Sequence, residues 1–360
     1  MKKILTLFLT LVCVIAFSGC SELSPEHQFS AELSSDGEYH WYACLDDNCT
    51  EVYKKEKHSY GLGKFSGVDD EISYERQCLV CAYKDNPTVE ILYSDMDADD
   101  VFRNYQGGGV FWLKQDQYSQ IDLEVGDLVL GCEDGTIING IKVTADTSKI
   151  DQGISNLEFH NLTFNASRDG FVGDYNILNL SFISCKFSGS AQICSSLYNG
   201  VQNCHIGNLV LKDCEFKDIH TANNLRSAVV VTACTDLTIE GCTFDGADFN
   251  ALQIGEKFLK GKIKITDNVF KNIGNRYVKL LETEQVTSCD ISGNTFYKTN
   301  LGDNPNDKRY GNYFQTIGGN IAIGINTWEE IPENDPIYFL SGNDASPIVY
   351  DPTVQKLLGA

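Results

Sequence analysis

The sequence predicts an all-β solenoid, and three observations lead to this prediction. One template, apolar-x-apolar-x-x-(Cys or Asn)-x-aromatic, recurs seven times, with one copy carrying Leu at the Cys or Asn position. Its closing aromatic residues follow one another at intervals of 23, 29, 28, 26, 26 and 32 residues. Short strand-like segments lie between the copies. Periods of this length are typical of solenoids, in which each repeat buries its apolar face against its neighbours. The aromatic residues are Phe164, Phe187, Phe216, Phe244, Phe270, Phe296 and Trp328.

The segments between the copies indicate which solenoid to expect. A leucine-rich repeat has a similar core template, but its convex side usually carries helical or irregular segments. Here the intervening stretches are "SAVVVTA" (227–233), "NALQIG" (250–255) and "YVKLLET" (277–283). They are short, partly β-branched and bounded by Gly, Asn or Asp, as strands are. A coil of two or three short strands and tight turns is a right-handed parallel β-helix, which we expect over residues 88–350.

These repeats resemble those of the pectin-lyase-like superfamily over residues 88–350. The resemblance implies a site in a groove across the stacked strands and acidic polysaccharides as common substrates. Fold alone does not establish function. We find neither the paired-aspartate and Arg-x-Lys motifs of polygalacturonases nor the Arg-rich strand motifs of pectate lyases. Those branches are therefore disfavoured.

The Cys or Asn position of the template lies in a turn, two residues before the aromatic. In successive coils we expect the residues at this position to stack about 4.8 Å apart. Asparagines in such a column can pass hydrogen bonds from coil to coil, and cysteines fill the same space as reduced, apolar side chains. The column consists of Leu162, Cys185, Cys214, Cys242, Asn268, Asn294 and Asn326.

A solenoid needs a cap at each end. "DDVFRNYQ" at 99–106 begins with two helix-start aspartates and places apolar side chains on one face, which predicts an N-terminal capping helix. Residues 351–360 begin with Asp351 and Pro352, a favourable helix start, and are predicted to form a C-terminal capping segment.

The first twenty residues have the pattern of an export signal. Lys2 and Lys3 precede an apolar run that is too short to span a bilayer comfortably. The ending at 16–20, "AFSGC", resembles the lipobox of bacterial lipoproteins, which implies lipidation of Cys20 and residues 1–20 as the signal peptide. An ordinary secretory signal is the alternative. In both cases we expect an exported protein, and with the lipobox one anchored by lipid to a bacterial membrane at the cell surface.

After a linker at 21–26, residues 27–85 form a Cys/His-rich segment. Its two cysteine pairs resemble a small zinc ribbon, and the segment is similar to Cys/His modules beside the anchor of bacterial surface proteins. A structural zinc held by four thiolates, or by three with His40 or His58, is one expectation. Disulfide bonds, with three possible connectivities, are the other. No organic cofactor is expected. The cysteines are Cys44, Cys49, Cys78 and Cys81.

The charge of −22 argues against nucleic acid as a partner, because phosphate contacts require basic clusters. The best catalytic candidates are Glu256 and Glu282, which each lie twelve residues after a template aromatic and should stack on adjacent coils. Two carboxylates about 5 Å apart repel, so one would hold a proton or share a cation. Arg276 and Lys279 lie nearby. A solvated ladder of turn residues is the alternative to a catalytic pair.

Three functions fit the sequence. The chain is a surface β-helix protein that interacts with glycans, or a polysaccharide lyase or glycoside hydrolase, or a structural or adhesive surface protein. The first is favoured because no catalytic signature is evident. The oligomeric state does not follow from the sequence.

Overall fold

The computed structural model describes residues 27–46, 48–68, 70–93, 96, 101–102, 108–114, 117–124, 126–143, 154–167, 169–173, 176–195, 204–220, 226–297, 312–316, 321–329, 338–341 and 348–349. They divide into two compact units, and the boundary falls between Pro87 and Thr88. Gly67–Ile72, which the sequence analysis placed in the Cys/His segment, groups with the second unit. The predicted signal with Cys20, the linker 21–26 and the capping segment 351–360 lie outside the described residues.

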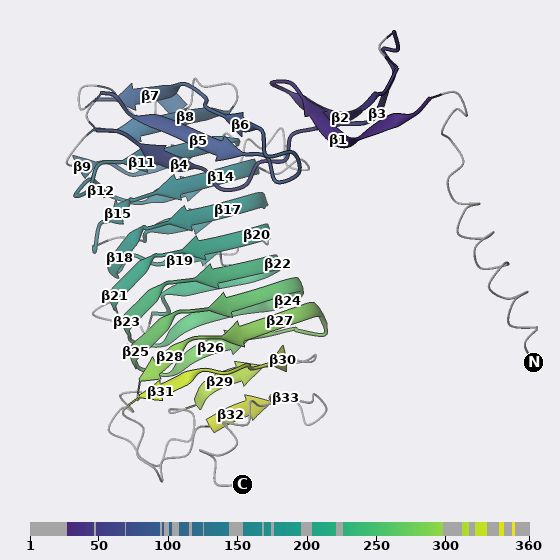
Figure 1. The fold of residues 1–360 in the computed structure, drawn as a ribbon. Helices are drawn as coiled ribbons and strands as arrows, with labels where there is room; N and C mark the ends of the chain where they lie inside the picture. The colour runs from purple at the N-terminus through teal and green to yellow at the C-terminus, as the bar shows by residue number, and fades with distance from the viewer. Residues whose placement is uncertain are drawn as a thin grey trace, which may run out of the picture. The chain divides into compact units, whose positions relative to one another are not determined.

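The second unit is a right-handed parallel β-helix, built from three stacks of parallel strands (Figure 1). The first stack contains β10 (Ile121–Leu123), β13 (Ile141–Val143), β16 (Phe171–Gly173), β19 (Ile193–Ser195), β22 (Val229–Glu240), β24 (Asn250–Thr266), β26 (Arg276–Leu280), β29 (Asn312–Thr316) and β32 (Tyr338–Ser341). The second contains β7 (Val89–Leu92), β8 (Gly109–Leu113), β11 (Leu128–Cys132), β14 (Ile154–His160), β17 (Ile177–Ile183), β20 (His205–Lys212), the later parts of β22 and β24, and β27 (Gln285–Ser292). The third contains β9 (Gln117–Tyr118), β12 (Ile137–Ile138), β15 (Thr163–Phe164), β18 (Lys186–Gly189), β21 (Glu215–Ile219), β23 (Thr243–Ala247), β25 (Val269–Ile273), β28 (Thr295–Tyr297) and β31 (Thr327–Glu329). A separate parallel pair is formed by β30 (Ile321–Ala322) and β33 (Ile348–Val349).

The predicted intervening strands are confirmed as β22, β24 and β26 of the first stack. This result excludes the leucine-rich repeat, which would place helical or irregular segments there. β22 and β24 continue round the corner into the second stack without a break: Val229–Val231 pairs with β19, and the later residues of β22 pair with β20. Two of the predicted strands are therefore longer than expected, because each joins what the sequence divides into two strands.

The template aromatics form a continuous column inside the third stack. Phe187, Phe216 and Phe244 are at most 1% exposed, and their successive ring centroids lie 4.6 and 4.7 Å apart with the planes within 6° of parallel. The same stacking continues from Phe164 at one end to Trp328 at the other. Strand pairing holds adjacent coils one strand spacing apart, so a residue repeated in register stacks on its own copy. The aromatic period of the sequence is thus the repeat of the coil.

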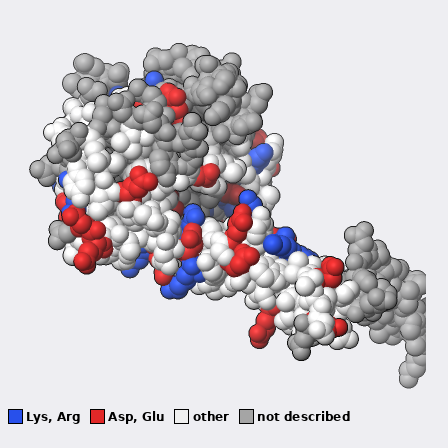
Figure 2. Space-filling model, turned by 90° about the horizontal axis from the view of Figure 1, so that it is seen from above, with Lys and Arg blue, Asp and Glu red and all other residues white. Residues whose placement is uncertain are grey.

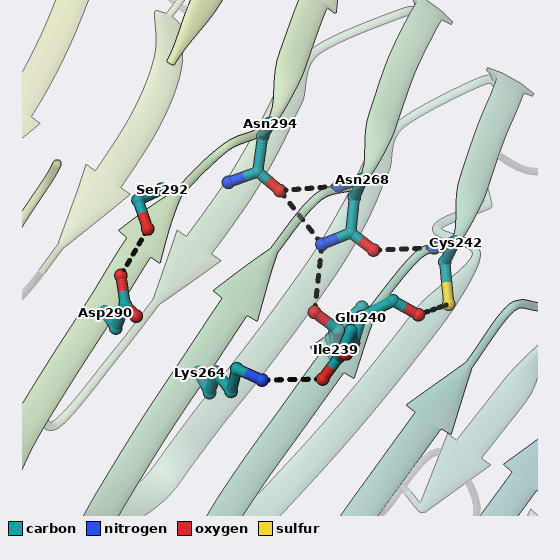
Figure 3. A network of polar contacts seen from close by, with 8 residues as sticks. All are labelled: Ile239, Glu240, Cys242, Lys264, Asn268, Asp290, Ser292 and Asn294. Carbon is teal, nitrogen blue, oxygen red and sulfur yellow. Dashed lines mark hydrogen bonds and ion pairs between the residues drawn. The ribbon is translucent and has the colours of Figure 1, made fainter. Parts of the chain in front are cut away.

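The turn column predicted from the sequence is confirmed (Figure 3). Backbone N–H groups of Cys242, Asn268 and Asn294 each donate to the amide oxygen of the next asparagine, at 2.8, 3.0 and 2.9 Å. The N–H of Cys214 donates to the sulfur of Cys242 at 3.4 Å, so a thiol accepts where an amide does further along. The thiols of the column donate to backbone carbonyls, for example Cys214 to Phe182 at 3.3 Å. Buried polar groups in this column are therefore paired with one another.

The residue just before each member of the Cys/Asn column is most often Asn, Asp or Gly, and its backbone conformation explains why. It adopts a left-handed backbone conformation in six consecutive coils, with φ between 54° and 70°. Glycine enters that region freely, and asparagine and aspartate enter it more readily than other residues. The chain thereby turns from the second stack into the third. The six residues are Asn161, Ser184, Asp213, Gly241, Asp267 and Gly293.

Replacing Asn268 by alanine is expected to lower the free energy of unfolding by about 2–4 kcal/mol, because the buried N–H of Cys242 loses its acceptor and the carbonyl of Ile239 loses the hydrogen bond from the Asn268 amide. Asn268→Cys should cost less, since its sulfur can accept from Cys242 as Cys242 accepts from Cys214. Denaturant unfolding of the two variants measures the difference. Equal losses would show that the column contributes packing alone.

The N-terminal end of the β-helix is described only in part. Of the predicted capping helix at 99–106, Val101 and Phe102 are described, and the rest lies outside the described residues. Phe102 is 1% exposed, and its ring meets that of Phe111 edge-on at 5.1 Å. An apolar side chain from this segment therefore packs on the core, as a cap requires.

The first unit is a small antiparallel module. β1 (Phe29–Ser35), β2 (Tyr39–Cys44) and β3 (Val52–Lys57) form one sheet, and β4 (Lys64–Ser66), β5 (Ser73–Gln77) and β6 (Lys84–Asp85) form another. Among its described residues only His40, Tyr74 and Cys78 are buried. Such a module has almost no apolar core, so its stability must come from elsewhere.

Candidate metal centre and binding cleft

Four side chains of the module converge on one point. His40 lies on β2, His58 follows β3, and Cys78 and Cys81 lie at the end of β5 and in the turn that leads to β6. One ligand atom from each lies within 4.8 Å of all the others. Nδ1 of His40 is 4.0 Å from Sγ of Cys78, and Nδ1 of His58 is 3.4 Å from Sγ of Cys81. The group therefore ties the two small sheets of the module together.

The outer atoms of this group are held in place by hydrogen bonds. Nε2 of His58 lies 2.8 Å from the carbonyl oxygen of Asp36, which fixes the ring with Nδ1 directed at the sulfurs. The ring of His58 also stacks on Tyr83 with centroids 4.7 Å apart. The N–H of Val80 donates to Sγ of Cys78 at 3.4 Å. Histidine ligands of metals commonly donate their second N–H in this way.

The sulfur of Cys78 is suited to act as a thiolate. Burial disfavours its charged form, but the backbone N–H groups of Cys81 and Val80 and the side chain of His58 outweigh burial and lower the pKa to about 6. The pKa of Cys81 is raised, first by burial and then by the neighbouring Cys78. A thiolate is the form that ligates a metal.

Two sulfurs and two imidazole nitrogens match a tetrahedral zinc site. Ligand atoms around such a zinc lie roughly 3.3–3.8 Å from one another, which follows from bonds of about 2.3 Å to sulfur and 2.0–2.1 Å to nitrogen. The measured separations approach this range. A four-ligand group of this kind is closed, so the metal would serve structure rather than chemistry.

The four cysteines predicted as one zinc site fall into two groups. Cys78 and Cys81 lie with both His40 and His58, so two histidines take the places expected for two sulfurs. Cys44 and Cys49 lie instead with His27, which the sequence analysis did not single out as a ligand. All four are thiols in this structure. Of the three possible disulfide connectivities, the two groups fit the one that joins Cys44 to Cys49 and Cys78 to Cys81.

The β-helix carries a cleft at the corner between its second and third stacks, near the N-terminal end. It has a volume of about 650 Å³ and is lined by Gly67, Val68, Ile72 and residues of the first coils, among them Trp112, Glu133, Asp134 and Lys186. Pockets of this volume that combine apolar and polar walls are typical of small-ligand sites. Cys132 also lines it, but burial raises its pKa to about 12, so its thiol stays protonated.

Charges at the cleft are paired. Nζ of Lys186 lies 3.0 Å from Asp134, and Nζ of Lys114 lies 2.9 Å from Asp70 and 3.6 Å from Glu133. These lysines lower the pKa values of Asp134 and Asp70, chiefly through the hydrogen bonds they donate. Figure 2 shows the same interspersion of acidic and basic side chains on the face it presents. The cleft thus offers many polar contacts with little net charge.

Of the predicted carboxylate pair, Glu256 and Glu282, the structure describes only the side chain of Glu282. β24 and β26 pair in register up to Ile254 and Leu280, which brings the chain just before Glu256 beside the chain just before Glu282. Glu282 is exposed, whereas the side chain of Glu256 lies outside the described residues. Arg276 is 8% exposed and Lys279 is half-buried. The pairing of the two carboxylates stays a prediction.

Comparison with protein-family models, with curated proteins and with solved structures gives no match. In the part of the chain that the structure describes, no helix is both long and apolar enough to cross a bilayer.

Proposed function

We propose that this chain is an exported, lipid-anchored bacterial surface protein whose β-helix binds a polysaccharide. The cleft beside Trp112, Asp134 and Lys186 carries the proposal, because it joins an aromatic side chain to several polar groups in one concave site. Polar groups of this kind can hydrogen-bond sugar hydroxyls. The signal-like N-terminus and Cys20 support the proposed location.

The charge balance favours a neutral polysaccharide. Lys186, which lines the cleft, and Lys114, which contacts the lining residue Glu133, each have a carboxylate neighbour within 4 Å, so neither is an isolated cation for a uronate. The net charge of −22 also opposes the approach of a polyanion. This choice departs from the acidic ligands that the superfamily resemblance implies.

We further propose that zinc occupies the group of His40, His58, Cys78 and Cys81. The donor set and the hydrogen bond from His58 to Asp36 support zinc as a structural ion. His40 and His58 hold the ion from the first sheet, and Cys78 and Cys81 hold it from the end of β5 and the following turn. The ion then replaces the apolar core that the module lacks.

A panel of neutral and uronate polysaccharides tests the function. The purified chain should be retained by a neutral polymer, and Asp134→Ala together with Lys186→Ala should weaken retention at least about tenfold, since hydrogen bonds to charged groups contribute roughly 1.5–3 kcal/mol each. The matched control is Glu240→Ala with Lys264→Ala, an ion pair of 2.6 Å on β22 and β24, away from the cleft residues in sequence. The control should bind as the parent does.

Other outcomes of the same panel identify the other functions. New reducing or unsaturated ends that vanish in Glu256→Gln would make the chain a hydrolase or lyase. Retention equal in the cleft variant and the control would place binding elsewhere on the chain. Neither retention nor cleavage would leave a structural or adhesive surface protein.

A further inference from the structure

A second group of metal ligands lies at the other end of β2. Nδ1 of His27 is 3.7 Å from Sγ of Cys44 and 3.2 Å from Sγ of Cys49. The three ligand atoms all lie within 4.8 Å of one another. His40 and Cys44 are four residues apart on one strand, a length of about 13 Å, so the two groups are separate sites rather than one shared cluster.

The antiparallel register builds this second group. Phe29 of β1 pairs with Cys44 of β2, so His27, two residues before Phe29, extends past the end of β2 where Cys44 lies. Cys49 comes from the loop between β2 and β3, which turns back at a hydrogen bond from the N–H of Cys49 to the carbonyl of Asp46. The N–H of Glu51 donates to Sγ of Cys49 at 3.4 Å. Three chain segments thus bring their ligands to one place through backbone pairing.

The number of donors distinguishes the two groups. The first has four ligands, whereas among the residues that the structure describes the second has three. Zinc with three protein ligands keeps its fourth position for water or for an added ligand, and zinc with four does not. Two thiolates and an imidazole also favour zinc over the hard cations magnesium and calcium.

The three-ligand group borders a cleft of about 610 Å³. His27 itself lines this cleft, together with Phe29, Tyr42, Tyr53 and Lys54. Nζ of Lys54 lies 5.3 Å from the centre of the Tyr53 ring, over its face. Because both residues line the cleft, the cleft wall carries a cation. His27 therefore brings one side of the ligand group to solvent-accessible space, and Lys54 of the same cleft is a cation that attracts an anion there.

We propose that His27, Cys44 and Cys49 form a second zinc site whose fourth coordination position opens into this cleft and takes water or a small anion. This inference is independent of the proposed function of the β-helix. It assigns the two ends of β2 different tasks: the four-ligand site holds the module together, and the three-ligand site binds an exchangeable ligand.

Cobalt(II) is the probe, because its visible spectrum reports the number and type of ligands. The whole chain, reduced and freed of metal, should bind two equivalents, and Cys49→Ser should bind one. Azide should change the spectrum of the parent and leave that of Cys49→Ser unchanged, since only the closed site remains in the variant. Cys289→Ser, which removes a half-buried thiol of β27, is the matched control and should behave as the parent does.

Four results would overturn the inference. A parent that binds one equivalent, with the same equivalent still bound by Cys49→Ser, has no second site. A parent spectrum that ignores azide means that a further residue of the chain closes the site. A Cys44–Cys49 disulfide in the chain isolated from its export compartment means that the sulfurs serve as a crosslink. His27→Gln guards against misfolding of Cys49→Ser: each variant should keep the cobalt spectrum of the four-ligand site, and loss of both metals in both variants would contradict two separate sites.

Discussion

Cys81→Ser is expected to unfold the Cys/His module while the β-helix stays folded. Three of the module's described residues are buried, and two of them, His40 and Cys78, belong to the four-ligand group. Zinc bound to such a group stabilises small domains by about 10–16 kcal/mol near neutral pH, more than a module of this size gains from burial. Loss of one ligand should therefore remove most of the module's stability.

Limited trypsin digestion of the whole chain measures this effect. The module carries Lys54, Lys57 and Arg76 on paired strands, where the backbone is held away from a protease, so unfolding makes several cleavage sites available. Cleavage there should be fast in Cys81→Ser, and in the parent after a strong zinc chelator is added. Cys81→His supplies a nitrogen ligand and should restore both bound zinc and protease resistance. A parent that resists trypsin equally with and without chelator would show that the module folds without metal.

The repeats of the β-helix could be predicted because their signals are local. The alternation before the turn at Asp213 and Cys214 and the spacing after it place Phe216 in the core without reference to any other coil. Stacking then follows from the repeat itself, since pairing in register puts like residues together. The division of β22 between two stacks is different. No Gly or Pro interrupts residues 229–240, and the point where the chain changes stacks depends on which strand, β19 or β20, lies beside it.

The two groups of metal ligands could be predicted less well, because their arrangement depends on contacts between distant parts of the chain. Residue types identified Cys44, Cys49, Cys78 and Cys81 as candidate ligands, but not how they divide. The division depends on the register of β1 against β2, which sets Cys44 beside the start of β1 and leaves His40 at the far end. His27 was missed as a ligand for the same reason. One feature of the sequence could have identified His27 as a ligand. It lies just before β1, a strand that can pair with the strand ending at Cys44.

Phe216→Ala is expected to lower the free energy of unfolding of the β-helix by about 3–5 kcal/mol, the usual cost of removing a buried phenylalanine. The ring is fully buried and stacks on both neighbours, at 4.6 Å from Phe187 and 4.7 Å from Phe244. Its removal takes away apolar burial and both ring contacts, and leaves a cavity that paired strands above and below cannot close.

Phe216→Leu separates these contributions. Leucine keeps most of the buried area but loses two stacking contacts, each worth about 0.5–1.5 kcal/mol, so we expect a loss of about 1–3 kcal/mol. Leu178→Ala on β17 is the surface control, since Leu178 is 61% exposed and should change stability by about 0.5 kcal/mol or less. Denaturant unfolding followed by circular dichroism compares the three. If Phe216→Ala lowered the free energy of unfolding no more than Leu178→Ala, the stacked aromatic rings would not contribute to the stability of the β-helix.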